Sequence, residues 1–131
     1  MEHPFAELIG LNVDVREQGY SECSIAITDK LLNPHSAVHG AVLYALADTG
    51  MGAALYPSLK DKELCATIEI KINYYQAVRS GRIRCATTVI NQGKKVANME
   101  SKIYVDDSLV AQANGNYAIF IPSKTPQSNV T

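Results

Sequence analysis

The apolar residues of this chain follow two periods, which predict one long helix and a series of strands. A nearly unbroken apolar run, AVLYALADTGMGAALY, covers residues 41–56 and predicts a helix over 40–56 that is buried on most faces. Pro57 should end this helix. Elsewhere apolar and polar residues alternate, which is typical of strands with one buried face. The alternation predicts strands over 11–15, 23–27, 68–75, 82–89, 97–105 and 111–119, after a short helix over 3–9.

Turn residues separate the predicted strands. The Gln18-Gly19 pair predicts a hairpin between the first two strands. Later turns imply that the remaining neighbours along the chain also pair antiparallel. These turns stand at Ser80-Gly81, Gln92-Gly93 and Asp106-Asp107.

The faces of the strands follow from the same alternation. On the third strand we expect Ile68, Ile70, Ile72 and Tyr74 to face the core. The segment 29–38 contains Asn-Pro and neither period, so it predicts a loop before the long helix. The order of elements indicates an α+β fold in which one face of a curled antiparallel sheet wraps the buried helix.

Length and composition indicate one domain over 1–131, with a polar tail over 122–131 that we expect to fray. The net charge of −1 argues against a nucleic-acid partner. The apolar run is too short to span a bilayer and contains an acid, and residues 1–10 lack the pattern of a signal peptide. Three cysteines without a CxxC motif favour a reducing compartment. We therefore expect a cytoplasmic protein without a membrane partner.

Asp48 is the residue that the apolar run does not explain. A carboxylate in an apolar helix is costly unless it is hydrogen-bonded or has a chemical role, and such groups concentrate at functional sites. A capping or core role is the alternative. His35 and His39 form an HxxxH pair that could suggest a metal. However, Pro34 disturbs the helix such a pair requires and no glutamate follows, so we expect neither metal nor cofactor.

The stretch NPHSAVHGAVLYALADT, residues 33–49, resembles the active-site segment of hotdog-fold acyl-CoA thioesterases. It is most similar to the phenylacetate-degradation type of the 4-hydroxybenzoyl-CoA thioesterase superfamily. The shared pattern consists of Asn33, then His39-Gly40, then Asp48 in Leu-Ala-Asp-Thr. Ala41 departs from the family's second glycine, and Gln76-Ala77 replaces a frequent proline. The resemblance implies a hotdog fold that covers the whole chain.

The resemblance also implies roles for the motif. Gly40 lies in the first turn of the helix, where a free backbone N–H can polarise a thioester carbonyl. Asp48 would be the base or the nucleophile. Asn33 would donate to the carboxylate or the water, and His39 would fix the start of the helix. Thr67 aligns with a family position whose hydroxyl orients the water, although an ordinary strand threonine is the alternative.

Spacing adds a constraint on these roles. Gly40 and Asp48 are eight residues apart, which is about 12 Å along one helix, so one chain cannot bring both to one thioester. The two groups must then come from different subunits with antiparallel helices. This requires a homodimer with two equivalent sites, and the family extends it to a tetramer that is a dimer of dimers.

The expected substrate is an acyl-CoA, in which CoA is part of the substrate and not a cofactor. Its phosphates would meet cations near two turns, although each cation could instead be an ordinary solvated residue. The candidates are Arg79, Arg82, Arg84, Lys94 and Lys95. A hotdog dehydratase of hydroxyacyl thioesters and a non-catalytic acyl-CoA-binding protein remain alternatives, and the acyl group stays open among aromatic, medium-chain and branched classes.

Overall fold

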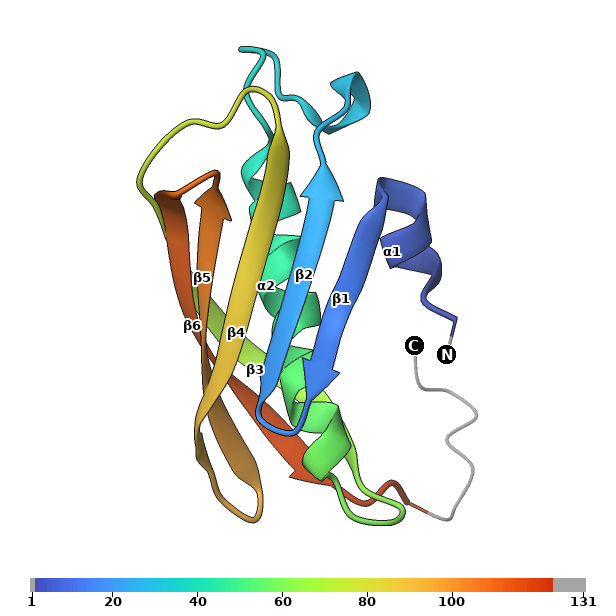
Figure 1. Cartoon of the computed structure of the whole chain (residues 1–131). Helices are drawn as coiled ribbons and strands as arrows, with labels where there is room; N and C mark the ends of the chain where they lie inside the picture. Colours follow the sequence, from blue (N-terminus) through green and yellow to red (C-terminus); the bar gives the residue numbers. More distant parts are fainter. Residues whose placement is uncertain (1, 124–131) are drawn as a thin grey trace.

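In the computed structural model, which describes residues 2–123, a six-stranded antiparallel sheet curls around one long helix (Figure 1). The strands lie in the order β1-β2-β4-β5-β6-β3. The helices are α1 (Pro4–Ile9) and α2 (Gly40–Leu55), with 3-10 turns at η1 (Asp29–Leu31) and η2 (Tyr56–Ser58). The strands are β1 (Leu11–Glu17), β2 (Tyr20–Ala26), β3 (Leu64–Tyr74), β4 (Arg82–Gln92), β5 (Val96–Val105) and β6 (Ser108–Phe120). This arrangement confirms the predicted hotdog layout. Of the tail predicted over 122–131, residues 124–131 lie outside the described residues.

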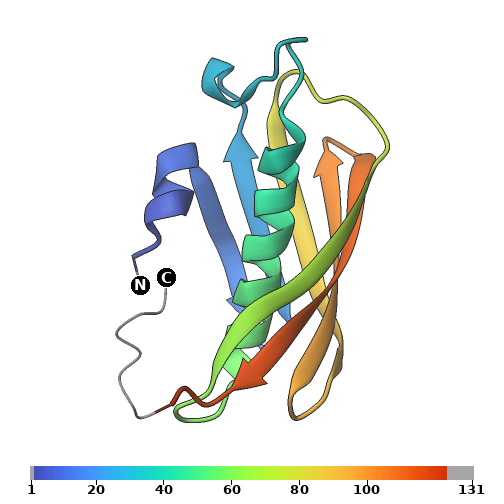
Figure 2. The same cartoon turned by 180° about the vertical axis from the view of Figure 1, so that it is seen from behind.

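The helix α2 lies along the concave face of the sheet, as seen from behind in Figure 2. Leu46, Ala47, Met51 and Leu55 are fully buried, as the long apolar run predicted. The helix ends at Leu55, and Pro57 lies in the following 3-10 turn. Within residues 2–123 no helix has both the length and the apolarity to cross a bilayer.

The predicted pairing of the third and fourth strands is wrong. β3 pairs with β6, and β4 pairs with β2 and β5. β4 therefore lies between β2 and β5 in the sheet, and both of its edges are already paired. The chain leaves β3 and crosses one end of the molecule through residues 75–81 before it enters β4 (Figure 1). The turn at Ser80-Gly81 thus ends a crossover connection and not a hairpin.

A β-bulge in β3 changes which residues face the helix. Thr67 pairs with Tyr117, whereas Glu69 pairs with Asn116, so Ile68 lies between the two registered pairs. Ile68 is 54% exposed, and its prediction as a core residue is wrong. The extra residue resets the alternation. Thr67 faces α2 before the bulge, and Ile70 packs against the core after it.

Buried hydroxyls attach α2 to the sheet beneath it. The Ser21 hydroxyl donates to the Gly50 carbonyl oxygen at 2.6 Å. The Thr87 and Ser101 hydroxyls share a hydrogen bond of 2.7 Å, and Ser101 also donates to the Ala47 carbonyl oxygen at 3.5 Å. These contacts flank Asp48 in the helix and fix the height of that segment above the sheet. The close approach at Gly50 is made by the side chains of Ser21 and Thr87.

The glycines of α2 differ in how closely the sheet approaches them, which gives a stability prediction. A Cβ atom at Gly50 would lie 2.6 Å from Thr87 Oγ1, whereas one at Gly52 would meet nothing closer than 3.7 Å. We expect Gly50→Ala to lower the free energy of unfolding by about 1–3 kcal/mol through overpacking. Gly52→Ala is the matched control and should be neutral or stabilising by up to about 1 kcal/mol, because alanine favours helix. Urea unfolding measures both. Equal stability of the two variants would contradict the prediction.

Candidate active site

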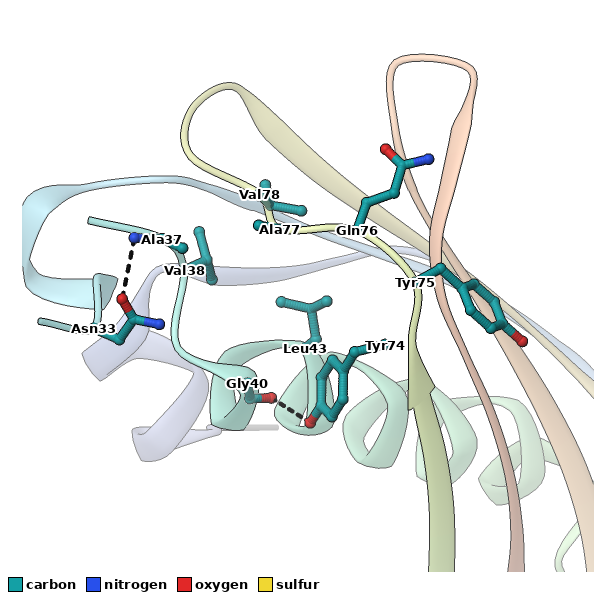
Figure 3. A pocket seen from close by; sticks show the side chains of 10 residues that line it. All are labelled: Asn33, Ala37, Val38, Gly40, Leu43, Tyr74, Tyr75, Gln76, Ala77 and Val78. Carbon is teal, nitrogen blue, oxygen red and sulfur yellow. Dashed lines mark hydrogen bonds between the residues drawn. The ribbon is translucent and has the colours of Figure 1, made fainter. Parts of the chain in front are cut away.

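The helix α2 contributes to several cavities, and Gly40 and Asp48 line two different ones. The first, of about 300 Å³, lies at its N-terminus and includes Gly40 and Asn33 in its wall (Figure 3). The second, of about 340 Å³, lies at mid-helix and includes Asp48 and Thr67. The structure therefore brings Asn33 to Gly40, and Thr67 to Asp48. It does not bring the two pairs together within one chain.

The start of α2 is capped in a way that leaves one donor free. His39 Nδ1 accepts a hydrogen bond from the Ala41 N–H at 2.9 Å, so this histidine fixes the helix start by hydrogen bonding, as predicted. The carbonyl oxygen of Gly40 accepts from the Tyr74 hydroxyl at 2.8 Å (Figure 3). Among residues 2–123 no acceptor binds the Gly40 N–H. That N–H is thus an unsatisfied donor at the positive end of the helix dipole.

Asn33 shapes the loop that precedes the helix. Its side-chain oxygen accepts from the backbone N–H groups of His35 at 2.9 Å and Ala37 at 3.2 Å. Figure 3 shows the Ala37 bond and the Asn33 amide group beside the Gly40 cavity. Within the described part of the chain, the amide nitrogen has no hydrogen-bond acceptor. The donor role predicted for Asn33 is therefore available, but Asp48 of the same chain lies in the other cavity.

The Asp48 carboxylate is held through one of its two oxygens. Thr67 Oγ1 donates to Oδ1 at 2.7 Å, which places this threonine at the site. The Tyr117 hydroxyl also contacts Oδ1, and it lies 2.6 Å from the Asp48 carbonyl oxygen. Among the described residues, no donor binds Oδ2. The arrangement leaves one carboxylate oxygen free at a cavity, as a base or nucleophile requires.

Tyr117 is the site residue that the sequence did not reveal. The alternation correctly placed it on the inner face of the last strand, but an inner-face tyrosine has no distinctive spacing. Its position opposite Thr67 across β3 and β6 was the missing information. Burial raises the pKa of Tyr117 well above its usual value, and the hydrogen bond to Asp48 raises it further. The phenol therefore remains protonated and able to donate.

Cys65 lines the same cavity as Asp48. Burial raises the pKa of its thiol, and the negative charge of Asp48 acts in the same direction. The thiol is therefore kept neutral, and a neutral thiol is a weak nucleophile.

The five predicted phosphate-binding cations fall into two groups. Arg79 donates to the His35 carbonyl oxygen at 2.9 Å, next to the Gly40 cavity. Arg82 and Arg84 lie at the start of β4, where they donate to Ser24 Oγ at 2.8 Å and to the Asp106 carbonyl oxygen at 3.0 Å. Lys94 and Lys95 lie beyond the other end of this 11-residue strand, about 35 Å away. One CoA molecule cannot meet both groups in one chain.

The two histidines of the HxxxH pair make other contacts. His39 Nδ1 accepts from the Ala41 N–H at the start of the helix, and the His35 carbonyl oxygen accepts from Arg79. Among residues 2–123, no three histidine, cysteine, aspartate or glutamate residues form a group that could hold a metal ion.

Together, the curled sheet, its central helix and the two cavities on that helix define a hotdog-fold enzyme. The profile described as the thioesterase superfamily matches residues 35–112. The chain therefore belongs to the thioesterase superfamily, and it is a thioester hydrolase.

Related proteins agree with this assignment. The 1,4-dihydroxy-2-naphthoyl-CoA hydrolase of Listeria monocytogenes is 26% identical over 97 residues, which cover 74% of this chain and 79% of that protein. The structure of a conserved protein from Pseudomonas aeruginosa is similar with a TM-score of 0.87 and 32% identity, covering 92% of this chain and 96% of that one. A phenylacetic acid degradation protein from Thermus thermophilus shares the fold, with a TM-score of 0.81 at 22% identity over 88% of this chain and 98% of that one.

Proposed function

We propose that this protein hydrolyses acyl-CoA thioesters to a free acid and CoA at two equivalent sites of a homodimer. In each site, Asp48 of one subunit acts beside the Gly40 N–H of the other. The observation that carries the proposal is the division of the motif. Gly40 and Asp48 open into different cavities of one chain, although one thioester needs both an oxyanion donor and a base or nucleophile.

The Gly40 half supplies electrostatic stabilisation. The free N–H at the first turn of α2 donates a hydrogen bond to the thioester carbonyl oxygen as that oxygen becomes negative. Glycine at this position allows the substrate to approach the backbone, because no side chain covers the N–H. The Asn33 amide lies in the same cavity and can donate to the attacking water or to the partner subunit's Asp48.

The Asp48 half supplies the attack. As a base, the carboxylate takes a proton from water while the water oxygen bonds to the carbonyl carbon. The carbon–sulfur bond then breaks, and the CoA thiolate leaves and takes up a proton. As a nucleophile, Asp48 bonds to that carbon first, the carbon–sulfur bond breaks, and the CoA thiolate leaves and takes up a proton. Water then cleaves the resulting anhydride, which releases the free acid and restores the Asp48 carboxylate. The hydroxyl of Thr67 holds the carboxylate in either case.

The edge of the sheet supports dimer formation. Within residues 2–123, β3 is the last strand of the sheet and pairs with β6 alone, so its outer edge can pair with another chain. Leu64, Ile68, Tyr74 and Tyr75 are exposed on or beside this strand. A twofold axis next to β3 would place two α2 helices antiparallel, with the Gly40 cavity of one facing the Asp48 cavity of the other. Two such dimers would form the tetramer.

Among the candidate cations, Arg79 has the best position to bind a phosphate of CoA. Arg79 follows residues 76–78, which line the Gly40 cavity, so it is the cation best placed for a CoA phosphate at that site. Arg82 and Arg84 lie at the start of the following strand, β4, whereas Lys94 and Lys95 could reach CoA only from another subunit.

Three unpaired cysteines fit a reducing compartment, which supports the cytoplasm as the place of action.

Hydrolysis of an acyl-CoA panel tests the proposal. Aromatic, medium-chain and branched acyl-CoAs are incubated with the wild-type protein, and release of the CoA thiol is measured. We expect at least one class to reach a kcat/KM of about 10⁴ M⁻¹s⁻¹ or more. The same acyl groups as oxygen esters form the control and should react far more slowly. Binding of acyl-CoA without release of thiol from any thioester would contradict the proposal and favour a binding protein.

A further inference from the structure

The hydrogen bonds of Asp48 divide its carboxylate into two unequal oxygens. Oδ1 contacts the hydroxyls of Thr67 and Tyr117, whereas Oδ2 has no donor among the described residues. Thr67 and Tyr117 are directly opposite each other on β3 and β6. Two adjacent strands therefore hold the same oxygen, and the rotation of the carboxylate is fixed by the sheet rather than by the helix that bears it.

We propose that Tyr117 is a positioning residue which, together with Thr67, fixes Asp48 so that Oδ2 is the oxygen that reacts. This inference rests on the proposed function, because it assigns a role within the same site. Tyr117 lines the Asp48 cavity, and its hydroxyl contacts the carboxylate. It acts through Asp48, by restricting where that carboxylate can point.

Three further observations suit Tyr117 to this role. Its hydroxyl lies 2.6 Å from the carbonyl oxygen of Asp48, so it contacts both the backbone and the side chain of that residue. Its side chain is only 5% exposed, so water competes poorly for these bonds. A Cβ atom at Gly52 would lie 3.7 Å from its hydroxyl oxygen, so the phenol occupies the space beside α2 that this glycine leaves open.

The fixed oxygen has a chemical consequence. A carboxylate on a free side chain rotates, and both of its oxygens exchange between solvent and substrate. Two hydroxyl donors on Oδ1 remove this freedom, which lowers the entropy cost of reaching the reactive geometry. They also disperse charge on Oδ1 while Oδ2 stays open to the cavity.

Other titratable or charged side chains line this cavity from several elements. Cys65 on β3 is neutral, as described above. The others are His3 beside α1, Arg16 on β1 and Tyr56 in η2. None of them has a recorded hydrogen bond to the Asp48 carboxylate within residues 2–123. Removal of the Tyr117 hydroxyl should therefore change the environment of Asp48 more directly than any change at these residues.

The variant Tyr117→Phe tests the inference, since it keeps the ring and removes only the hydroxyl. We expect kcat for the best acyl-CoA to fall about 10- to 100-fold, with KM within about twofold. Tyr20→Phe is the matched control. It removes a phenol that donates to Glu22 at 2.7 Å, away from both cavities, and should leave activity unchanged.

Thr67→Val provides a second measurement in case Tyr117→Phe fails to fold. It removes the other donor on Oδ1 at an edge strand, and it should also lower kcat with little change in KM. The inference is overturned if folded Tyr117→Phe keeps the wild-type kcat, or if it raises only KM. If Tyr117→Phe does not fold, an unchanged kcat in Thr67→Val overturns it instead. The proposed function fails differently, through a wild type that cleaves no thioester or an Asp48→Asn variant that stays active.

Discussion

Asp48→Asn is expected to lower the rate of thioester hydrolysis by about 10²–10⁴-fold while the protein stays folded. An amide has nearly the shape of a carboxylate, but it neither accepts a proton near neutral pH nor forms the anhydride with the acyl carbon. The asparagine oxygen can still accept from Thr67 and Tyr117, which bind Oδ1 in the wild type. The lost activity would therefore report chemistry and not a disordered site.

The measurement combines kinetics, stability and binding. We expect kcat to fall, whereas the midpoint of thermal unfolding and the affinity for acyl-CoA change little. Asp14→Asn is a suitable control. Asp14 also accepts a hydroxyl hydrogen bond, from Ser24 at 2.6 Å, but it lies on β1 outside both cavities. A folded Asp48→Asn variant with full activity would show that Asp48 has only a structural role.

Mixing two inactive variants is expected to restore activity, because each site takes its two halves from different chains. Gly40→Pro removes the proposed oxyanion donor. Proline is well tolerated at the first position of a helix, and His39 already has the extended backbone, φ −61° and ψ 136°, that a residue before proline adopts. Gly40→Ala is the matched control, since it adds the same Cβ but keeps the N–H. That Cβ would lie 3.1 Å from the Tyr74 hydroxyl, at the end of a side chain that can shift.

In a dimer of one Asp48→Asn chain and one Gly40→Pro chain, one site carries both changes and the other carries neither. Random reassociation of equal amounts makes half of the dimers mixed, so about a quarter of the wild-type activity should return. Two different affinity tags on co-expressed chains allow the mixed dimer to be isolated, and it should show about half of the wild-type activity. If the mixture stays as inactive as its components, or if a monomer is fully active, the shared site is wrong.

The parts of the fold that follow from local periodicity were predictable. The inner faces of β4, β5 and β6 are buried as the alternation indicated, including Cys85, Ser101 and Ala113. The long apolar run gave α2 its place at the centre because a helix that is apolar on most faces must be covered all round. The motif placed Asp48 on this helix, and the structure adds the cavity on which it opens.

Other features depend on contacts between distant segments, which periodicity does not contain. The partner of β3 is β6, because β4 has both edges filled. The role of Tyr117 depends on its register opposite Thr67, some fifty residues earlier. The cations near two turns resembled one cluster along the sequence, but a whole strand separates Arg82 from Lys94.

The bulge at Ile68 divides β3 into two segments with different roles. The segment before it carries Thr67 and meets Asp48, whereas the segment after it carries Ile70 and Ile72 and completes the core. Because the extra residue uncouples the phase of the two segments, substitutions around Thr67 need not be matched by repacking around Ile70.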